Sequence, residues 1–325
     1  MSTPRLSILI VSWNVSELLK ECLHSIEAVR ETVPLEVIVV DSGSSDDTVA
    51  MVRASYPWVQ LLPQPENVGF ARGNNIAIEE ARGETLFLLN PDTVVVGNAL
   101  QTLLDTLERH PEAGVVGPQL RFPDGSPQSS RRRFPTLTSA FFESTWLEPW
   151  APRHVIERYH ATDLPPHREV EVDWIVGAAM MVRRAVVETV GLLDEEYFMY
   201  SEELDWCRRI RAAGWRILHQ PAAVVVHHAG KSSEQAATDR HINFQRAKLR
   251  YFRKHHGNTA YGALRLFLLL NYLWQLLLEC GKWLLGHRRA LRRQRVVAYW
   301  QVLRSGLPAA GASEVVLLEA GAERK

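Results

Sequence analysis

Asp92 is the residue around which the chemistry of this 325-residue chain is expected to be organised. An apolar run of strand length, Thr85 to Leu89, is followed by Asn90, Pro91 and Asp92. Because proline cannot donate a hydrogen bond to a ladder, the strand ends there and the Asp92 carboxylate emerges at its carboxyl end. Open α/β sheets bind ligands at this edge, where a carboxylate can hold Mg²⁺ or Mn²⁺ together with substrate phosphates. Taken alone, Asp92 could equally be a solvated turn residue.

Two further residues strengthen the chemical interpretation. Leu35 to Val40 is a largely β-branched run that ends at Asp41, so this carboxylate has the same position at a strand tip as Asp92. Arg72 lies in a glycine- and asparagine-rich stretch before a helix. A guanidinium held near two strand-tip carboxylates could engage a nucleotide phosphate or base.

The elements that must position these residues alternate between strand and helix. Leu6 to Ser12 is expected to be a buried strand, and the segment after it has apolar residues at helical spacing. A third short strand near 59–62 and a helix ending before Gly83 complete the pattern up to Asp92. Strand–helix–strand units form parallel sheets with right-handed crossovers, which predicts an α/β fold with a mainly parallel sheet.

Composition narrows the class of protein. Lys and Arg total 37 and so do Asp and Glu, but the part of the chain after Arg246 is strongly basic. The amino terminus lacks the long apolar core of a signal peptide, and three widely separated cysteines favour neither a disulfide framework nor a zinc site, so a cytoplasmic location is expected. No G-x-G-x-x-G follows the first strand, which argues against a Rossmann oxidoreductase. No nucleic-acid partner is expected.

A series of motifs, in order, resembles the family 2 glycosyltransferases. These motifs are Leu6 to Asn14, Val40-Asp41 with Ser44-Ser45-Asp46, Asn67 to Asn75, Leu89 to Asp92, Asp124 to Ser129, Arg132 to Leu137, Val172 to Met180, Phe198 to Arg209, and His227 to Ser233. The Asn-Pro-Asp version resembles the rhamnosyltransferase-type members. The resemblance covers about residues 5 to 235.

The resemblance implies a GT-A-type, Rossmann-like domain over residues 1–235. Its nucleotide-sugar-binding half would be residues 1–95 and its acceptor and catalytic half residues 96–235, followed by a basic, amphipathic helical tail over 236–325. The irregular stretch from Arg121 to Val170 is long enough to be a binding loop or lid. Within it, Arg131, Arg132 and Arg133 could be a solvated run or could meet the phosphates of an acceptor lipid.

The resemblance also implies roles for individual residues. Glu203 would be the general base, with its neighbour Glu202 left open as the alternative, because this chain has Glu-Glu where many relatives have Glu-Asp. Asp92 and His227 would hold a divalent metal, Mg²⁺ or Mn²⁺. The donor would contact Ser12, Asn14, Asp41, Arg72, Asn75 and Asp92, with Asp41 on the imide N–H of uracil or thymine. Asp173, Trp174 and Gly177 would line the sugar and acceptor pocket, although Trp174 could also be a core aromatic.

The expected function is therefore inverting, metal-dependent glycosyl transfer. The donor would be a dTDP- or UDP-sugar, with dTDP-L-rhamnose favoured. The acceptor would be a cell-surface polysaccharide or a polyprenyl-linked glycan, which places the enzyme in cell wall polysaccharide biosynthesis. The alternatives are the same fold with UDP-galactofuranose or a UDP-N-acetylhexosamine, and a non-catalytic nucleotide-sugar-binding protein.

The leucine-rich stretch from Tyr261 to Gly286 is expected to lie on the inner face of the cell membrane without crossing it. Asn271, Gln275, Glu279 and Lys282 form one polar stripe at helical spacing, and no uninterrupted apolar run approaches the roughly 20 residues of a span. Apolar residues gather on another side, as in an interfacial helix: Leu269, Leu273, Leu276, Leu277, Cys280 and Leu284. The alternative is that this face packs on the catalytic domain or on a second subunit in a homodimer.

Overall fold

The computed structural model describes residues 4–143, 145–228, 237–286 and 288–308. The chain forms two compact units. The first consists of residues 1–134, 160–195 and 202–232, and the second of residues 135–159, 196–201 and 233–325. The sequence placed a single boundary near residue 235. The structure differs because segments 135–159 and 196–201 cluster with the carboxyl-terminal helices.

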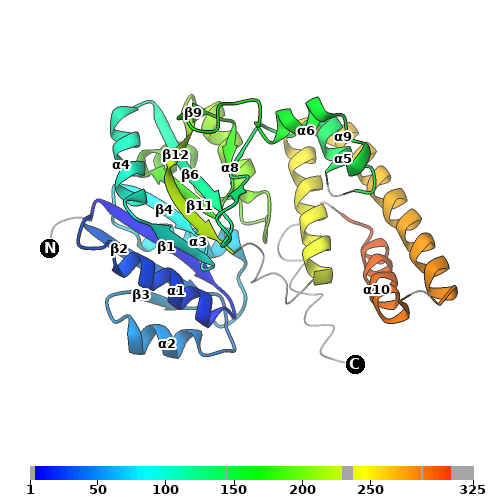
Figure 1. The fold of residues 1–325 in the computed structure, drawn as a ribbon, viewed down its shortest axis with the longest axis horizontal. Helices are drawn as coiled ribbons and strands as arrows, with labels where there is room; N and C mark the ends of the chain where they lie inside the picture. Colours follow the sequence, from blue (N-terminus) through cyan, green and yellow to red (C-terminus); the bar gives the residue numbers. More distant parts are fainter. Residues whose placement is uncertain (1–3, 144, 229–236, 287, 309–325) are drawn as a thin grey trace. The chain divides into compact units, whose positions relative to one another are not determined.

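The first unit is built on a mixed sheet with strand order β3-β2-β1-β4-β11-β6-β12-β5 (Figure 1). Strands β3, β2, β1 and β4 run parallel, β11 is antiparallel to both of its neighbours, and β6 pairs in parallel with β12. The long strands are Leu6–Ser12 (β1), Leu35–Asp41 (β2), Gln60–Pro63 (β3), Thr85–Leu89 (β4), Thr93–Val96 (β5), Ala113–Arg121 (β6), Ala179–Arg183 (β11) and Arg216–His227 (β12). The short strands are Pro127–Gln128 (β7) on β6, Val170–Glu171 (β9) on β12, and a separate ladder of Arg131–Arg132 (β8) with Trp174–Ile175 (β10).

Helices cover both faces of this sheet because side chains alternate along each strand. Ile8 and Ile10 belong to the core cluster that also contains Leu19 and Leu23 of the first helix. On the opposite face, a Cβ at Gly73 would lie 2.7 Å from a methyl group of Val11. The helix that contains Gly73 therefore packs closely against this face of the sheet. The helices are Ser16–Glu27 (α1), Thr48–Ser55 (α2), Phe70–Glu80 (α3), Ala99–Arg109 (α4), Arg184–Val190 (α7) and Glu202–Ala212 (α8). The predicted α/β class is confirmed.

The second unit is helical. It contains Leu137–Phe142 (α5), the 3-10 turn Glu148–Trp150 (η1), Arg153–Tyr159 (α6), Ala237–Leu284 (α9) and Arg289–Ser305 (α10). Gly257, with φ 84° and ψ 175°, divides α9 into two helical segments. The α5 region packs on α9: the rings of Phe141 and Phe267 lie 4.8 Å apart, and Lys248 donates to the carbonyl of Glu143 at 2.9 Å.

Helix α9 buries some of its polar side chains and exposes many of its large apolar ones, unlike a helix that packs an apolar face on a water-soluble core. Asn271 and Glu279, which the sequence placed in the polar stripe, are 2% and 6% exposed. Glu279 accepts two hydrogen bonds from Arg292 of α10, at 2.8 and 2.7 Å. Lys282 of the polar stripe is exposed, and so are many large apolar residues of this stretch: Leu266, Leu270, Leu273, Trp274, Leu277, Leu278, Trp283, Leu284 and Leu285.

The sequence predicts that the leucine-rich part of α9 does not cross a membrane, but the length and composition of the helix differ from that expectation. Among the described residues, one helix, Ile242–Leu284, is long and apolar enough to cross a membrane by these two criteria, and 28% of its most apolar window is buried. The polar residues that interrupt the apolar run in the sequence do not remove it from this class. Two of them, Asn271 and Glu279, lie inside the unit.

Candidate active site

Asp92 and His227 meet at one edge of the sheet. The antiparallel register of β5 and β12 places His227 opposite Thr93, the residue after Asp92. His227 Nε2 lies 3.3 Å from Asp92 Oδ1, and the backbone N–H of His228 donates to the Asp92 carbonyl at 3.0 Å. Both side chains are nearly buried, with Asp92 3% and His227 9% exposed. The sequence-predicted pair is therefore assembled from strands far apart in the chain.

The donor set at this pair fits a divalent cation that is shared with a substrate. A carboxylate oxygen and an imidazole nitrogen converge there, and the buried Oδ1 of the adjacent Asn90 has no hydrogen-bond partner. No group of three or more His, Cys, Asp or Glu side chains with metal-ligand geometry occurs within the described parts of the chain. Asp92 and His227 could supply two ligands, since Mg²⁺ or Mn²⁺ commonly takes its remaining ligands from phosphates and water.

A second polar cluster lies at the tips of β1 and β2. The strand register pairs Ser12 with Asp41. Asp41 is 1% exposed; its Oδ2 accepts from the backbone N–H of Ser44 at 3.1 Å, whereas its Oδ1 is buried without a partner. The hydroxyl of Ser12 is likewise buried without a partner. Since buried polar atoms are normally hydrogen-bonded, these two atoms have capacity for a ligand.

The other three residues expected to contact the donor are Asn14, Arg72 and Asn75, and their surroundings differ. Asn14, at φ 52°, accepts from the backbone N–H of Ser45 at 2.7 Å and so holds the loop after β2. Arg72 is exposed and makes no hydrogen bond or ion pair with the described residues. The buried amide of Asn75 donates to Leu193 O and Glu195 Oε1 and accepts from Leu193 N–H, so its hydrogen-bonding groups are used within the protein.

Glu202 and Glu203 begin α8 after two residues in the left-handed region, Tyr200 at φ 74° and Ser201 at φ 64°. Non-glycine residues held there store backbone strain, which is common at functional sites. Glu202 is 4% exposed, and its burial together with the adjacent charge of Glu203 raises its pKa well above the usual value. Burial also raises the pKa of Glu203, but the N–H of Gly177 and the charge of Arg132 act in the opposite direction.

Gly177 is the expected pocket residue that approaches Glu203. Its N–H points to Glu203 Oε1 at 3.5 Å, and a Cβ built on it would lie 3.4 Å from Glu203 Cβ and Cγ. Asp173 accepts from the N–H of Phe134 at 2.9 Å, and Trp174 donates to Arg133 O at 3.0 Å. Asp173 and Trp174 thus hold the segment 132–134, and Trp174 is 7% exposed, as a core aromatic would be.

The three arginines 131–133 are partly exposed, and each also interacts with protein groups. Arg131 donates to Pro165 O and Leu164 O, both at 2.9 Å. Arg133 pairs with Asp163 at 2.7 Å. Arg132 donates to the Ser129 hydroxyl.

A family model described as "Glycosyltransferase like family 2" matches residues 4–242. The chain belongs to this family. Two curated relatives of this glycosyltransferase are a rhamnosyltransferase that acts on N-acetylglucosaminyl-diphospho-decaprenol in Mycobacterium tuberculosis and the rhamnosyltransferase WbbL of Escherichia coli K12. The first is 32% identical, with the match covering 77% of this chain and 89% of the relative; the second is 28% identical, with 68% and 83% covered.

Solved structures show the same fold. A mannosyltransferase of Pyrobaculum calidifontis in complex with GDP-Man and Mn²⁺ superposes with a TM-score of 0.53 at 19% identity, over 99% of this chain and 80% of that one. The enzyme GalNAc-T7 with UDP, GalNAc and Mn²⁺ superposes with a TM-score of 0.55 at 16% identity, over 69% and 43%. The predicted GT-A-type fold is confirmed.

One residue of this glycosyltransferase site did not emerge from the sequence as a site residue. Gln128 contributes the oxygen nearest to His227, with 2.7 Å between its Oε1 and His227 Nδ1. It lies inside the Asp-Gly-Ser-Pro-Gln stretch of the family resemblance, but nothing local connects it to a histidine 99 positions later. The final part of the motif around His227, residues 229–233, lies outside the described residues.

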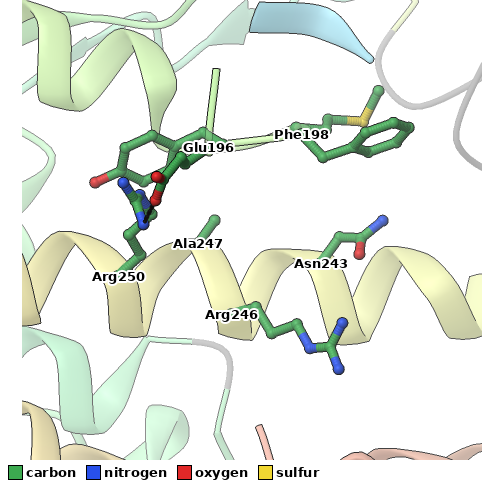
Figure 2. A pocket seen from close by; sticks show the side chains of 8 residues that line it. Glu196, Phe198, Asn243, Arg246, Ala247 and Arg250 are labelled. Carbon is green, nitrogen blue, oxygen red and sulfur yellow. Dashed lines mark ion pairs between the residues drawn. The ribbon is translucent and has the colours of Figure 1, made fainter. Parts of the chain in front are cut away.

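The second unit of the glycosyltransferase contains a small pocket between segment 196–199 and α9 (Figure 2). Figure 2 shows Arg250 directed toward Glu196, with which it forms an ion pair, whereas Arg246 points away from that segment. The cavity of about 10 Å³ has room for about one water molecule. It is too small to be a sugar site, and the polar groups at the edge of the sheet remain the candidate for donor binding.

Proposed function

We propose that this glycosyltransferase transfers a hexose, with inversion, from a pyrimidine nucleotide sugar to a glycan acceptor, and that the preferred donor is dTDP-L-rhamnose. The observation that carries the proposal is the Asp92–His227 pair at the same sheet edge as the unpartnered oxygen of Asp41. The two relatives named above, both rhamnosyltransferases, support rhamnose as the sugar.

Asp41 and Ser12 would recognise the base of the donor. The free Oδ1 of Asp41 is an acceptor, which suits the imide N–H of thymine or uracil. Arg72, exposed at the start of α3, has the charge and reach to bind the diphosphate.

Asp92 and His227 would hold Mg²⁺ or Mn²⁺ next to the donor diphosphate. A bound cation supplies charge neutralisation for the departing nucleoside diphosphate. Asn90 places an amide nitrogen 3.5 Å from His227 Nε2. These residues would thus orient the leaving group.

Glu203 would accept the proton of the attacking hydroxyl. The N–H of Gly177 and the charge of Arg132 favour its ionised form, whereas Glu202, more deeply buried, would stay protonated beside it. A single base activates the acceptor for direct displacement, and direct displacement inverts the anomeric centre. Asp173 and Trp174 would shape the acceptor side by holding segment 132–134.

The acceptor would be a polyprenyl-linked glycan, reached from the cytoplasmic face of the membrane. The exposed leucine and tryptophan side chains of α9 offer a surface for lipid, and basic residues follow them at Arg288, Arg289, Arg293 and Arg295. Because α10 carries exposed Arg293, Arg295 and Arg304, lipid cannot surround both helices, so we propose peripheral contact. A homodimer that buries the same face is the alternative.

A thermal-shift and turnover panel tests the reaction. The donors are dTDP-L-rhamnose, UDP-galactofuranose, UDP-N-acetylglucosamine and GDP-mannose, each with Mn²⁺. A donor at a hundred times its dissociation constant stabilises the protein by about 2.7 kcal/mol, and dTDP-L-rhamnose is expected to do so. Asp92→Asn should abolish turnover and the metal dependence of donor binding. Turnover that resists EDTA would contradict the metal site, a preference for a UDP-sugar would replace rhamnose, and no turnover with any donor would favour a binding protein.

A further inference from the structure

Gln128 lies against the nitrogen of His227 that faces away from Asp92. Its Oε1 is 2.7 Å from His227 Nδ1, a distance typical of a strong hydrogen bond. The backbone of Gln128 is held in place, because β7 pairs with β6 opposite Leu120 and the Gln128 carbonyl accepts from Gln119 Nε2 at 3.0 Å. The Gln128 side chain therefore approaches the imidazole from a backbone that is held in place.

The second ring nitrogen of His227, Nε2, has polar neighbours of its own. Asn90 Nδ2 lies 3.5 Å from His227 Nε2, and an amide NH₂ can only donate. Nε2 faces both this donor and the Asp92 carboxylate, whereas the carbonyl oxygen of Gln128 lies 2.7 Å from Nδ1. The shortest of these three contacts therefore favours the neutral imidazole with its proton on Nδ1. The lone pair of Nε2 is then directed to the side where Asp92 Oδ1 lies, 3.3 Å away.

We propose that Gln128 is a positioning residue: its Oε1 accepts the Nδ1 proton of His227 and so presents the Nε2 lone pair beside the Asp92 carboxylate. Histidines that ligate metals usually donate their other N–H to such an acceptor, and losing the acceptor costs about 10- to 100-fold in metal affinity. The consequence for metal binding rests on the proposed function, whereas the hydrogen bond itself does not.

Nitrogen NMR of the full-length, metal-free protein tests the hydrogen bond directly. Histidine is labelled with ¹⁵N, the protein is kept in alkaline solution with EDTA, and His227→Asn assigns the signal. The wild type and Gln128→Glu, whose carboxylate still accepts, should show a pyrrole-type Nδ1 and a pyridine-type Nε2. Gln128→Leu should lose this preference, and Gln101→Leu, a glutamine replacement on α4, should keep it. A wild-type imidazole protonated on Nε2 would overturn the proposal.

Mn²⁺ binding in the presence of dTDP, followed by electron paramagnetic resonance, measures the consequence. We expect Gln128→Leu to bind Mn²⁺ about 10- to 100-fold more weakly, while Gln128→Glu and Gln101→Leu stay near the wild type. Equal affinity in Gln128→Leu and the wild type would overturn the positioning role. If Asp92→Asn also binds like the wild type, the metal assignment of the proposed function fails instead, and the NMR result still decides the hydrogen bond. Gln128→Glu keeps the test valid should Gln128→Leu fold poorly.

Discussion

The two glutamates at the start of α8 differ in their surroundings, and the roles proposed for them rest on this difference. Glu202 is 4% exposed with an unpartnered Oε2, and the charge of Glu203 beside it raises its pKa further. Glu203 is half-buried and faces the N–H of Gly177. A general base must be ionised, and the surroundings of Glu203 favour ionisation more than those of Glu202 do.

Replacing each glutamate separately tests this assignment. Glu203→Gln should lower kcat by about 10²- to 10⁴-fold with little change in donor affinity, because a positioned base acts only on the chemical step. Glu202→Gln, which replaces a group expected to be protonated with a neutral amide, should keep much of the rate. The measurement is steady-state turnover together with donor binding. A large loss in Glu202→Gln alone would move the base by one residue.

The pH dependence of kcat/KM tests the role of Glu203 independently. Burial raises the pKa of Glu203, so the acid limb of kcat/KM should lie above the usual carboxyl range, with activity lost as pH falls through that pKa. Arg132 lowers the pKa of Glu203 by its positive charge, so Arg132→Gln should shift the acid limb to higher pH.

Arg133→Gln is the matched control for that profile, because the Arg133 guanidinium pairs with Asp163 and does not contribute to the Glu203 shift. Its acid limb should coincide with that of the wild type. A shift of equal size in both variants would mean that the segment 131–133 acts through its conformation and not through the charge of Arg132.

At the scale of elements, the loop that follows β2 depends on a close approach at Gly43. Gly43 has φ 71°, and a Cβ built on it would lie 2.6 Å from the backbone carbon of Glu66. The same loop supplies the N–H of Ser44 to Asp41. We therefore expect the position of the Asp41 carboxylate, proposed to recognise the base, to depend on Gly43, which has no side chain to contact the donor.

Gly43→Ala should destabilise the protein by about 2 to 4 kcal/mol, since it combines left-handed strain of about 1 kcal/mol with steric overlap of about 1 to 3 kcal/mol. It should also weaken donor binding. Gly125→Ala is the matched control, because Gly125 has φ 81° but no atom within 4 Å of an added Cβ. Urea unfolding measures both variants; equal losses would show that backbone strain alone matters at Gly43.

At the scale of the whole molecule, the exposed apolar surface of α9 is the feature that needs a partner. Leu266, Leu270 and Leu277 are 61%, 56% and 59% exposed, while Glu279 on the same helix is buried against Arg292. Polar groups inside and leucines outside are typical of helices that meet lipid. The exposed basic residues Arg288, Arg289, Arg293 and Arg295 would complement an anionic membrane surface.

Vesicle flotation of the full-length protein tests this surface. The wild type should float with anionic vesicles at low salt and less at high salt, because the basic contribution is screened. The triple variant Leu266→Asn, Leu270→Asn, Leu277→Asn should stay with the soluble fraction. Replacing the exposed Val96 and Phe122 of the first unit with Asn is the control and should not change flotation. A wild type that ignores vesicles and sediments as a dimer would favour a second copy as the partner.

The sequence by itself determined the features that depend on neighbours along the chain. Strand ends at Ser12 and Leu89 follow from runs of apolar residues stopped by polar residues or proline, and the order of motifs identified the family. Asp92 and Asp41 could be selected because each lies at or just after the end of a strand, whereas Glu203 was selected through the family resemblance of the segment around it. Such positions are encoded locally, by periodicity and by terminating residues.

Only the tertiary structure decided which distant groups meet. The pairing of Gln128 with His227, and of Asn75 with Leu193 at a separation of 118 residues, depends on strand register and loop packing, which no local pattern encodes. The orientation of α9 has the same cause. A helix with one polar and one apolar stripe is amphipathic whichever face it buries. Here Asn271 and Glu279 of the polar stripe are buried, with Glu279 bonded to Arg292 of α10, while Leu266, Leu270 and Leu277 are exposed.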